Sequence, residues 1–158
     1  MIVEIPMLSS NKIEYDATLG IFRLDRPLYS PMHYPGEYGF MPGTLADDGD
    51  PADVLALASQ PSFTGCLIEV RPLGYLEMID GTERDQKILA VPKRDPRYEQ
   101  FHSVDQLPPH ARREIEHFFD IYKDLEGKHT RIEGWRGPIE ARKLIVQSRQ
   151  AYLDKKKP

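Results

Sequence analysis

Fourteen prolines, placed singly or in one adjacent pair along 158 residues, most constrain what this chain can fold into. Proline has no backbone N–H and a fixed φ, so it favours turns, strand edges and the first turn of a helix. The irregular spacing predicts many short elements separated by turns and does not indicate a proline-rich linker. The length is sufficient for one hydrophobic core, and we expect a single domain over residues 1–158.

Short strands are expected through the first ninety residues, where apolar and polar side chains alternate. Each alternating run is brief and is bounded by glycine, proline or aspartate. The segment between Arg26 and Asp53 lacks the alternation and is expected to be mostly loop. The expected strands cover residues 2–5, 12–16, 21–26, 54–57, 66–71, 74–78 and 86–91.

The later part of the chain changes to a helical period. Apolar side chains from Pro109 to Leu125 fall on one face, with proline suited to the first turn. A short strand is expected over residues 130–135, and a second helix over residues 139–152. Strands followed by helices predict an α+β domain, in which a closed or nearly closed barrel would protect the strand edges.

Charge and composition exclude several classes of protein. The chain has 21 Lys+Arg and 25 Asp+Glu, a formal net charge of -4, which disfavours a nucleic-acid partner. No apolar run approaches the roughly 20 residues of a membrane-spanning helix, and the N-terminus lacks the features of a signal peptide, so we expect a cytoplasmic protein that does not bind a membrane. The single cysteine, Cys66, excludes an intrachain disulfide.

Four aspartates within residues 47–53 form the most informative segment. An exposed acidic turn would have the same composition, so the segment alone leaves both that explanation and a metal site open. An EF-hand is excluded. If Asp48 were the first ligand of such a loop, Asp53 would stand where the loop requires glycine and Ser59 where it requires glutamate. Aspartates without histidine or cysteine suit Mg²⁺, or Mn²⁺ as a substitute.

Two expected strands carry a carboxylate and an ammonium two residues apart, in Lys12-Ile-Glu14 and Asp85-Gln-Lys87. Side chains at that spacing share one face of a strand, although surface ion pairs would look the same. Further polar groups accumulate around them: Arg26, Tyr34, Tyr38, Asp80, Tyr122 and Lys123. Cleavage of a phosphoanhydride needs both kinds of group, since carboxylates hold divalent ions and cations bind phosphoryl oxygens.

Short motifs follow one another in a fixed order along nearly the whole chain: Val3-Glu-Ile-Pro6, Asn11-Lys12, Leu24-Asp-Arg26, His33-Tyr-Pro-Gly-Glu-Tyr-Gly-Phe40, Asp48-Gly-Asp-Pro-Ala-Asp53, Asp85-Gln-Lys87, Ala90-Val-Pro92 and His117-Phe-Phe-Asp-Ile-Tyr-Lys-Asp-Leu-Glu126. This ordered set resembles the soluble family I inorganic pyrophosphatases of the bacterial type. The resemblance implies an OB-like five-stranded β-barrel with flanking helices. It also implies Mg²⁺-dependent hydrolysis of pyrophosphate to two orthophosphates by a metal-bridged water, with several Mg²⁺ ions per site, in a homo-oligomer that is commonly a hexamer.

The resemblance also implies roles for individual residues. Core metal ligands would be Asp48, Asp53 and Asp85, with Asp80 and Glu14 holding additional ions. Asp50 would accept or orient the proton of the attacking water. The phosphate-binding set would be Lys12, Arg26, Tyr38, Lys87, Tyr122 and Lys123, of which Lys12, Arg26 and Tyr38 would act with Asp50 in catalysis; Glu4 and Tyr34 would support the cavity.

Two other classes of function can be weighed against this one from the sequence. An OB-type oligonucleotide-binding module without catalysis would need a basic groove with aromatic stacking platforms. The candidate site instead holds more acids than bases. A noncatalytic metal-binding protein would not explain why phosphate-binding cations accompany the carboxylates.

Overall fold

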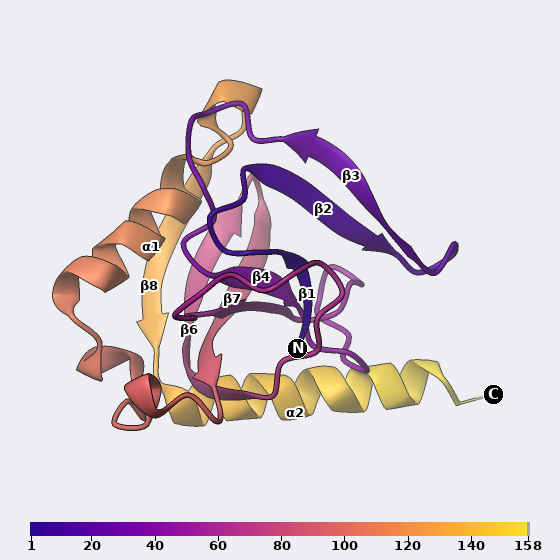
Figure 1. The fold of residues 1–158 in the computed structure, drawn as a ribbon. Helices are drawn as coiled ribbons and strands as arrows, with labels where there is room; N and C mark the ends of the chain where they lie inside the picture. The colour runs from indigo at the N-terminus through magenta and orange to yellow at the C-terminus, as the bar shows by residue number, and fades with distance from the viewer. Residues whose placement is uncertain (158) are drawn as a thin grey trace.

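The computed structural model describes residues 1–157, and its strands and helices form an α+β architecture (Figure 1). Residue 158, the last of the expected domain, lies outside the described range. The strands are β1 (Ile2–Ile5), β2 (Asn11–Asp16), β3 (Ile21–Pro27), β4 (Glu37–Phe40), β5 (Asp53–Ala56), β6 (Val70–Asp80), β7 (Glu83–Pro92) and β8 (Thr130–Arg136). The helices are α1 (Pro109–Ile121) and α2 (Pro138–Lys155), with the short 3-10 segments η1 (Pro96–Tyr98), η2 (Val104–Gln106) and η3 (Asp124–Glu126).

The strands form two separate sheets. Six of them pair in the order β1-β4-β5-β7-β6-β8, in which only β5 and β7 run parallel, while β2 and β3 form an antiparallel ribbon of their own. Among residues 1–157, no ladder joins β1 to β8. The described strands therefore form no closed barrel, because β2 and β3 pair only with each other, and the OB-like five-stranded barrel stays a prediction with which this arrangement is consistent. The α+β class is confirmed.

Strand β4 lies where the sequence predicted loop, so that prediction is wrong for Glu37–Phe40. The strand forms because β1 and β5 pair with it on both sides, with Gly39 opposite Val3 and Val54. A Cβ on Gly39 would lie 2.0 Å from the carbonyl oxygen of Ile2, so only glycine allows this approach. Long-range pairing, and not local alternation, makes this segment a strand.

Strand β6 begins at Val70, so the strand expected at 66–71 is wrong for residues 66–69, where only Leu67 forms an isolated bridge; β6 joins the remainder to the strand expected at 74–78. It continues through Pro72, where a register shift between Pro72 and Gly74 accommodates the missing N–H. Helix α1 ends at Ile121, four residues earlier than expected, and η3 follows.

Both faces of the central sheet are buried. Leu55 and Leu89 point to one side, where they join Phe118 and Phe119 of α1. Their strand neighbours, such as Val54 and Ile88, point to the other side, where Ala141 of α2 packs. The two helices therefore cover opposite faces of the sheet, α1 beside β8 and α2 across the base of the view in Figure 1.

Within the described part of the chain, neither helix combines the length and the apolar character that crossing a membrane requires.

Candidate functional site

A cleft of about 430 Å³ lies between the β2–β3 ribbon and the central sheet. Its floor comes from neighbouring strands β4, β5 and β7, and its rim from the loop after residue 47 and from the end of α1. The cleft brings together most of the site residues expected from the sequence: Glu4, Lys12, Glu14, Tyr38, Asp48, Asp50, Asp53, Asp85, Lys87, Tyr122 and Lys123.

Lys87 occupies the centre of the floor and is 5% exposed. Its Nζ lies 2.5 Å from Asp53 Oδ2 and 2.7 Å from Asp85 Oδ2, and it donates to the Tyr38 hydroxyl at 3.1 Å. The sequence dictates this cluster locally: Asp85 and Lys87 are two residues apart on β7, and the parallel pairing of Val54 with Ile88 sets Asp53 beside Lys87.

The charges in this cluster stabilise each other against burial. Burial alone would lower the pKa of Lys87, but Asp53, Tyr38 and Asp85 outweigh it, and the pKa stands well above the ordinary lysine value. Burial raises the pKa of Asp85, and Lys87 partly offsets that rise. Lys87 is therefore a charged group held inside the protein by its carboxylate partners.

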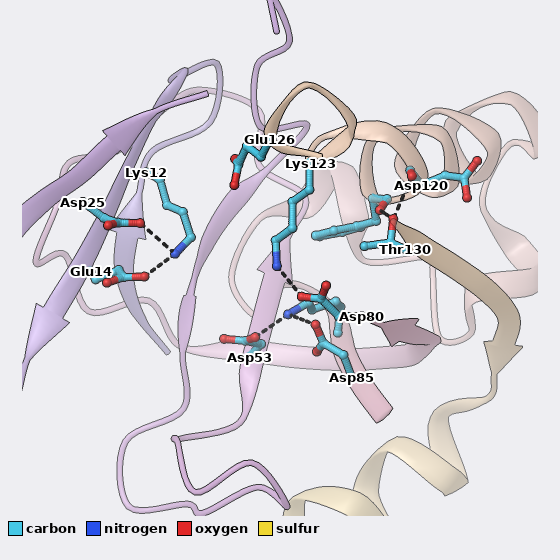
Figure 2. A network of polar contacts seen from close by, with 12 residues as sticks. Lys12, Glu14, Asp25, Asp53, Asp80, Asp85, Asp120, Lys123, Glu126 and Thr130 are labelled. Carbon is cyan, nitrogen blue, oxygen red and sulfur yellow. Dashed lines mark hydrogen bonds and ion pairs between the residues drawn. The ribbon is translucent and has the colours of Figure 1, made fainter. Parts of the chain in front are cut away.

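Two further lysines at the cleft pair with carboxylates, as Figure 2 shows. Lys123, just after α1, contacts Asp80 at the end of β6. Lys12 contacts Glu14 on the same strand, and its Nζ lies 3.3 Å from Asp25 Oδ2. Asp80 is not one of the lining residues of the cleft, but Lys123 connects it to the site.

The acidic loop forms one rim of the cleft. Asp48 and Asp50 are both exposed, and the backbone N–H of Asp50 donates to Asp48 Oδ1 at 3.0 Å. Gly49 between them has a φ of +93°, which glycine adopts without strain. Burial, followed by the charges of Asp48 and Asp53, raises the pKa of the Asp50 carboxyl. Asp50 therefore has more affinity for a proton than an ordinary surface aspartate.

Tyrosines line the inner wall and remain protonated donors. Burial raises the pKa of Tyr34, Tyr38 and Tyr122 above the ordinary tyrosine value. Tyr34 is 1% exposed and lies outside the cleft, with its ring centroid 5.2 Å from that of Tyr38. It supports the wall from behind, whereas Tyr38 and Tyr122 face the cleft.

Glu4 links the ribbon to the central sheet. Its Oε1 accepts a hydrogen bond from the backbone N–H of Tyr15 on β2 at 2.8 Å. Burial raises the pKa of the Glu4 carboxyl to about 7, although the Tyr15 N–H favours the charged form. Glu4 thus contributes to the shape of the cleft from the edge strand β1.

The donor set fits a hard divalent cation. Carboxylate oxygens of Asp48, Asp50, Asp53 and Asp85 line the cleft, and neither histidine nor cysteine does, which is the donor chemistry that Mg²⁺ and Mn²⁺ prefer. Across residues 1–157, no three acidic, histidine or cysteine side chains are gathered closely enough to hold an ion together. Lysine ammonium groups stand between the carboxylates instead.

Arg26 departs from the expected arrangement, because it does not line the cleft. Its guanidinium contacts Asp25 and donates two hydrogen bonds to the carboxylate of Glu126, and the pairing with Glu126 raises the pKa of Arg26. Sequence reasoning assigned no role to Asp25 or Glu126. Both lie inside the motifs that carry the resemblance and close in sequence to residues with an expected role. A single sequence, however, contains no pattern that indicates a contact between positions 26 and 126.

An α+β protein whose cleft combines aspartates with lysines and tyrosines belongs, by this chemistry, to the class that handles phosphates together with divalent cations. Comparisons with known proteins identify a family within this class. Residues 1–153 match the family model described as inorganic pyrophosphatase. The inorganic pyrophosphatase of Geobacillus stearothermophilus is 51% identical, over 98% of this chain and 93% of that protein, and that of Halalkalibacterium halodurans is 54% identical, over 95% and 92%.

A solved structure agrees with these sequence matches. The crystal structure of inorganic pyrophosphatase from Thermus thermophilus has a TM-score of 0.94 and 40% identity, over 97% of this chain and 90% of that one. The chain belongs to the inorganic pyrophosphatase family. The resemblance inferred from the ordered motifs is confirmed.

Proposed function

We propose that this protein hydrolyses inorganic pyrophosphate to two orthophosphates and requires Mg²⁺, for which Mn²⁺ is a possible substitute. The observation that carries the proposal is the position of Lys87, buried between Asp53 and Asp85 on the floor of the cleft. Groups that can hold metal ions and groups that can bind phosphate are thereby combined in one site, as hydrolysis of a highly charged phosphoanhydride requires. Membership of the family supports the same substrate.

The carboxylates would hold the metal ions. Asp48, Asp53 and Asp85 come from adjacent positions around the cleft, and Asp80 and Glu14 extend the set toward Lys123 and Lys12. Bound Mg²⁺ lowers the pKa of coordinated water and neutralises phosphoryl oxygens.

The remaining side chains would bind substrate and move a proton. Lys12, Lys87 and Lys123 would meet phosphoryl oxygens with ammonium groups, Tyr38 and Tyr122 would donate hydroxyl hydrogen bonds, and Arg26 would act from the ribbon. Asp50 would accept or orient the proton of the attacking water, in keeping with its raised pKa. Attack in line on one phosphorus expels the other phosphate, whose growing charge these cations stabilise.

Several finer features belong to the same proposal. The chain forms one domain over residues 1–158, its sheets follow an OB-like plan, and it acts in the cytoplasm as a homo-oligomer, a hexamer. An oligonucleotide-binding module is not favoured, because the cleft holds more carboxylates than cations.

Phosphate release tests the proposal. Purified protein with pyrophosphate and Mg²⁺ is expected to release orthophosphate, and chelation of the metal to abolish the release. Asp50→Asn is expected to retain Mg²⁺ binding, followed by calorimetry, but to lose turnover by about a hundredfold or more, the usual effect of removing a general base. A protein that binds Mg²⁺ and releases no phosphate would overturn the proposed activity; near wild-type turnover of Asp50→Asn would overturn only the role of Asp50.

A further inference from the structure

One ion pair in the protein joins segments 100 residues apart. Arg26 on β3 donates from Nε to Glu126 Oε1 at 2.9 Å and from Nη2 to Glu126 Oε2 at 2.6 Å. The Glu126 side chain is 7% exposed and that of Arg26 is 20% exposed. Two parallel bonds between a guanidinium and a carboxylate fix the orientation of both groups, which a single contact does not.

This pair connects two parts of the site that the backbone leaves unconnected. In the described residues, β2 and β3 share no ladder with the six-stranded sheet. Glu126 ends η3, the segment that follows Tyr122 and Lys123. In Figure 2 the Glu126 carboxylate points from this segment toward the ribbon, where Lys12 and Asp25 lie. The pair therefore joins the ribbon directly to the segment after α1, in addition to the contact of Glu4 with Tyr15 on the other side of the cleft.

The geometry leaves part of the guanidinium available. Arginine has five N–H donors, and the contact with Glu126 uses the edge formed by Nε and Nη2. The other edge includes Nη1, which contacts Asp25, and Asp25 Oδ2 also lies 3.3 Å from Lys12 Nζ. Lys12 lines the cleft, so Asp25 connects this second edge of Arg26 to a cation of the cleft lining.

We propose that Glu126 is a positioning residue for pyrophosphate hydrolysis, which holds the Nε edge of Arg26 so that the opposite edge of the guanidinium meets a phosphoryl group at the ribbon side of the cleft. This inference rests on the proposed function and assigns a role to a residue outside the expected site. Glu126 touches no substrate; it acts through Arg26.

A double-mutant cycle tests the coupling. Glu126→Gln keeps the size of the side chain but removes its charge, and it is expected to lower kcat/KM for pyrophosphate by about tenfold, in line with the loss of a charge-assisted contact. In the Arg26→Ala background the same substitution is expected to change kcat/KM less than twofold. Asp124→Asn, which removes a charge from the same segment without touching Arg26, is the matched control and is expected to leave kcat/KM unchanged.

A spectroscopic measurement separates positioning from folding. The Nε–H signal of Arg26 in ¹⁵N-edited NMR is expected to be slow in hydrogen exchange in the wild-type protein and in Asp124→Asn, and to become fast in Glu126→Gln while the amide spectrum stays dispersed. If Glu126→Gln does not fold, Glu126→Asp, which keeps the charge but shortens the reach, takes its place in both measurements.

The possible results separate the role of Glu126 from the proposed activity. Equal losses of kcat/KM in both backgrounds, an unchanged kcat/KM in Glu126→Gln, or an unchanged Arg26 Nε–H signal would overturn the inference while leaving the proposed activity in place. A wild-type protein that releases no phosphate would overturn the proposed function, and the role of Glu126 with it.

Discussion

At the scale of single residues, Lys87 shows how the cleft holds its charges before any ligand arrives. The ammonium lies between Asp53 and Asp85, both close enough for direct ion pairs. Without that cation, two carboxylates would face each other in a partly buried site, where like charges repel strongly. Lys87 therefore stabilises the fold as well as serving the proposed chemistry.

Replacing Lys87 by methionine is expected to lower the free energy of unfolding by about 3 kcal/mol in metal-free buffer, the usual effect of removing one partner of a buried ion pair. Mg²⁺ is expected to restore part of the loss, because a divalent cation can take the place of the ammonium. Urea denaturation with and without Mg²⁺ measures both effects. Lys93→Met is the control, since its pair with Glu69 is exposed; an equal loss in that variant would contradict the expectation.

The residue scale also marks a limit of sequence reasoning. Pairs two residues apart on a strand, such as Asp85 with Lys87, could be predicted because strand periodicity fixes which face they share. The partners of Arg26 could not all be predicted in this way. Asp25 is its neighbour in sequence, but Glu126 approaches it only after the ribbon and α1 have been placed in three dimensions.

At the scale of elements, the sequence predicted those strands whose own side chains alternate and failed where partners determine the structure. Strands β1, β2 and β3 and both helices were predicted within a few residues. Strand β4 has glycine and tyrosine in place of an apolar alternation, and it forms through pairing with β1 and β5. The proline within β6 indicated a break that a local register shift absorbs.

The close approach of β1 to β4 makes Gly39 a sensitive position. Gly39→Ala is expected to lower the free energy of unfolding by about 3 kcal/mol, because the new Cβ would lie 2.0 Å from the Ile2 carbonyl oxygen and would force the strands apart. Guanidinium denaturation measures the change.

Gly20→Ala provides a comparison at a position where a new side chain would be strained but not crowded. Gly20 has a φ of +67° with no atom within 4 Å of its would-be Cβ, so its substitution is expected to cost about 1 kcal/mol. Equal losses at Gly39 and Gly20 would show that backbone conformation, and not the approach of the strands, limits position 39.

At the scale of the whole molecule, the net charge of -4 does not describe how the charges are distributed. Carboxylates gather at one cleft, where divalent cations would neutralise them and allow an anion to bind. A protein with an acidic total can therefore bind a small, highly charged phosphate compound. The total alone could indicate only that a long polyanion is a poor partner.

Metal binding is expected to stabilise the whole protein. Mg²⁺ at about a hundred times its Kd adds roughly 2.7 kcal/mol by mass action, which raises Tm by about 5–10 °C for a chain of this size. Thermal denaturation followed by circular dichroism measures the shift. Asp53→Asn is expected to reduce it, and NaCl at equal ionic strength not to reproduce it; a similar rise with NaCl would assign the effect to screening of repulsion instead of to a site.

The lysines already paired with the site carboxylates also bear on ion selectivity. Each ammonium supplies one positive charge to Asp53, Asp80 or Glu14. A sodium or potassium ion that displaced a lysine would bring no more charge than it removed, whereas a divalent ion brings twice as much. We therefore expect the site to favour divalent over monovalent ions, because an entering ion must bring more charge than the lysine that it displaces.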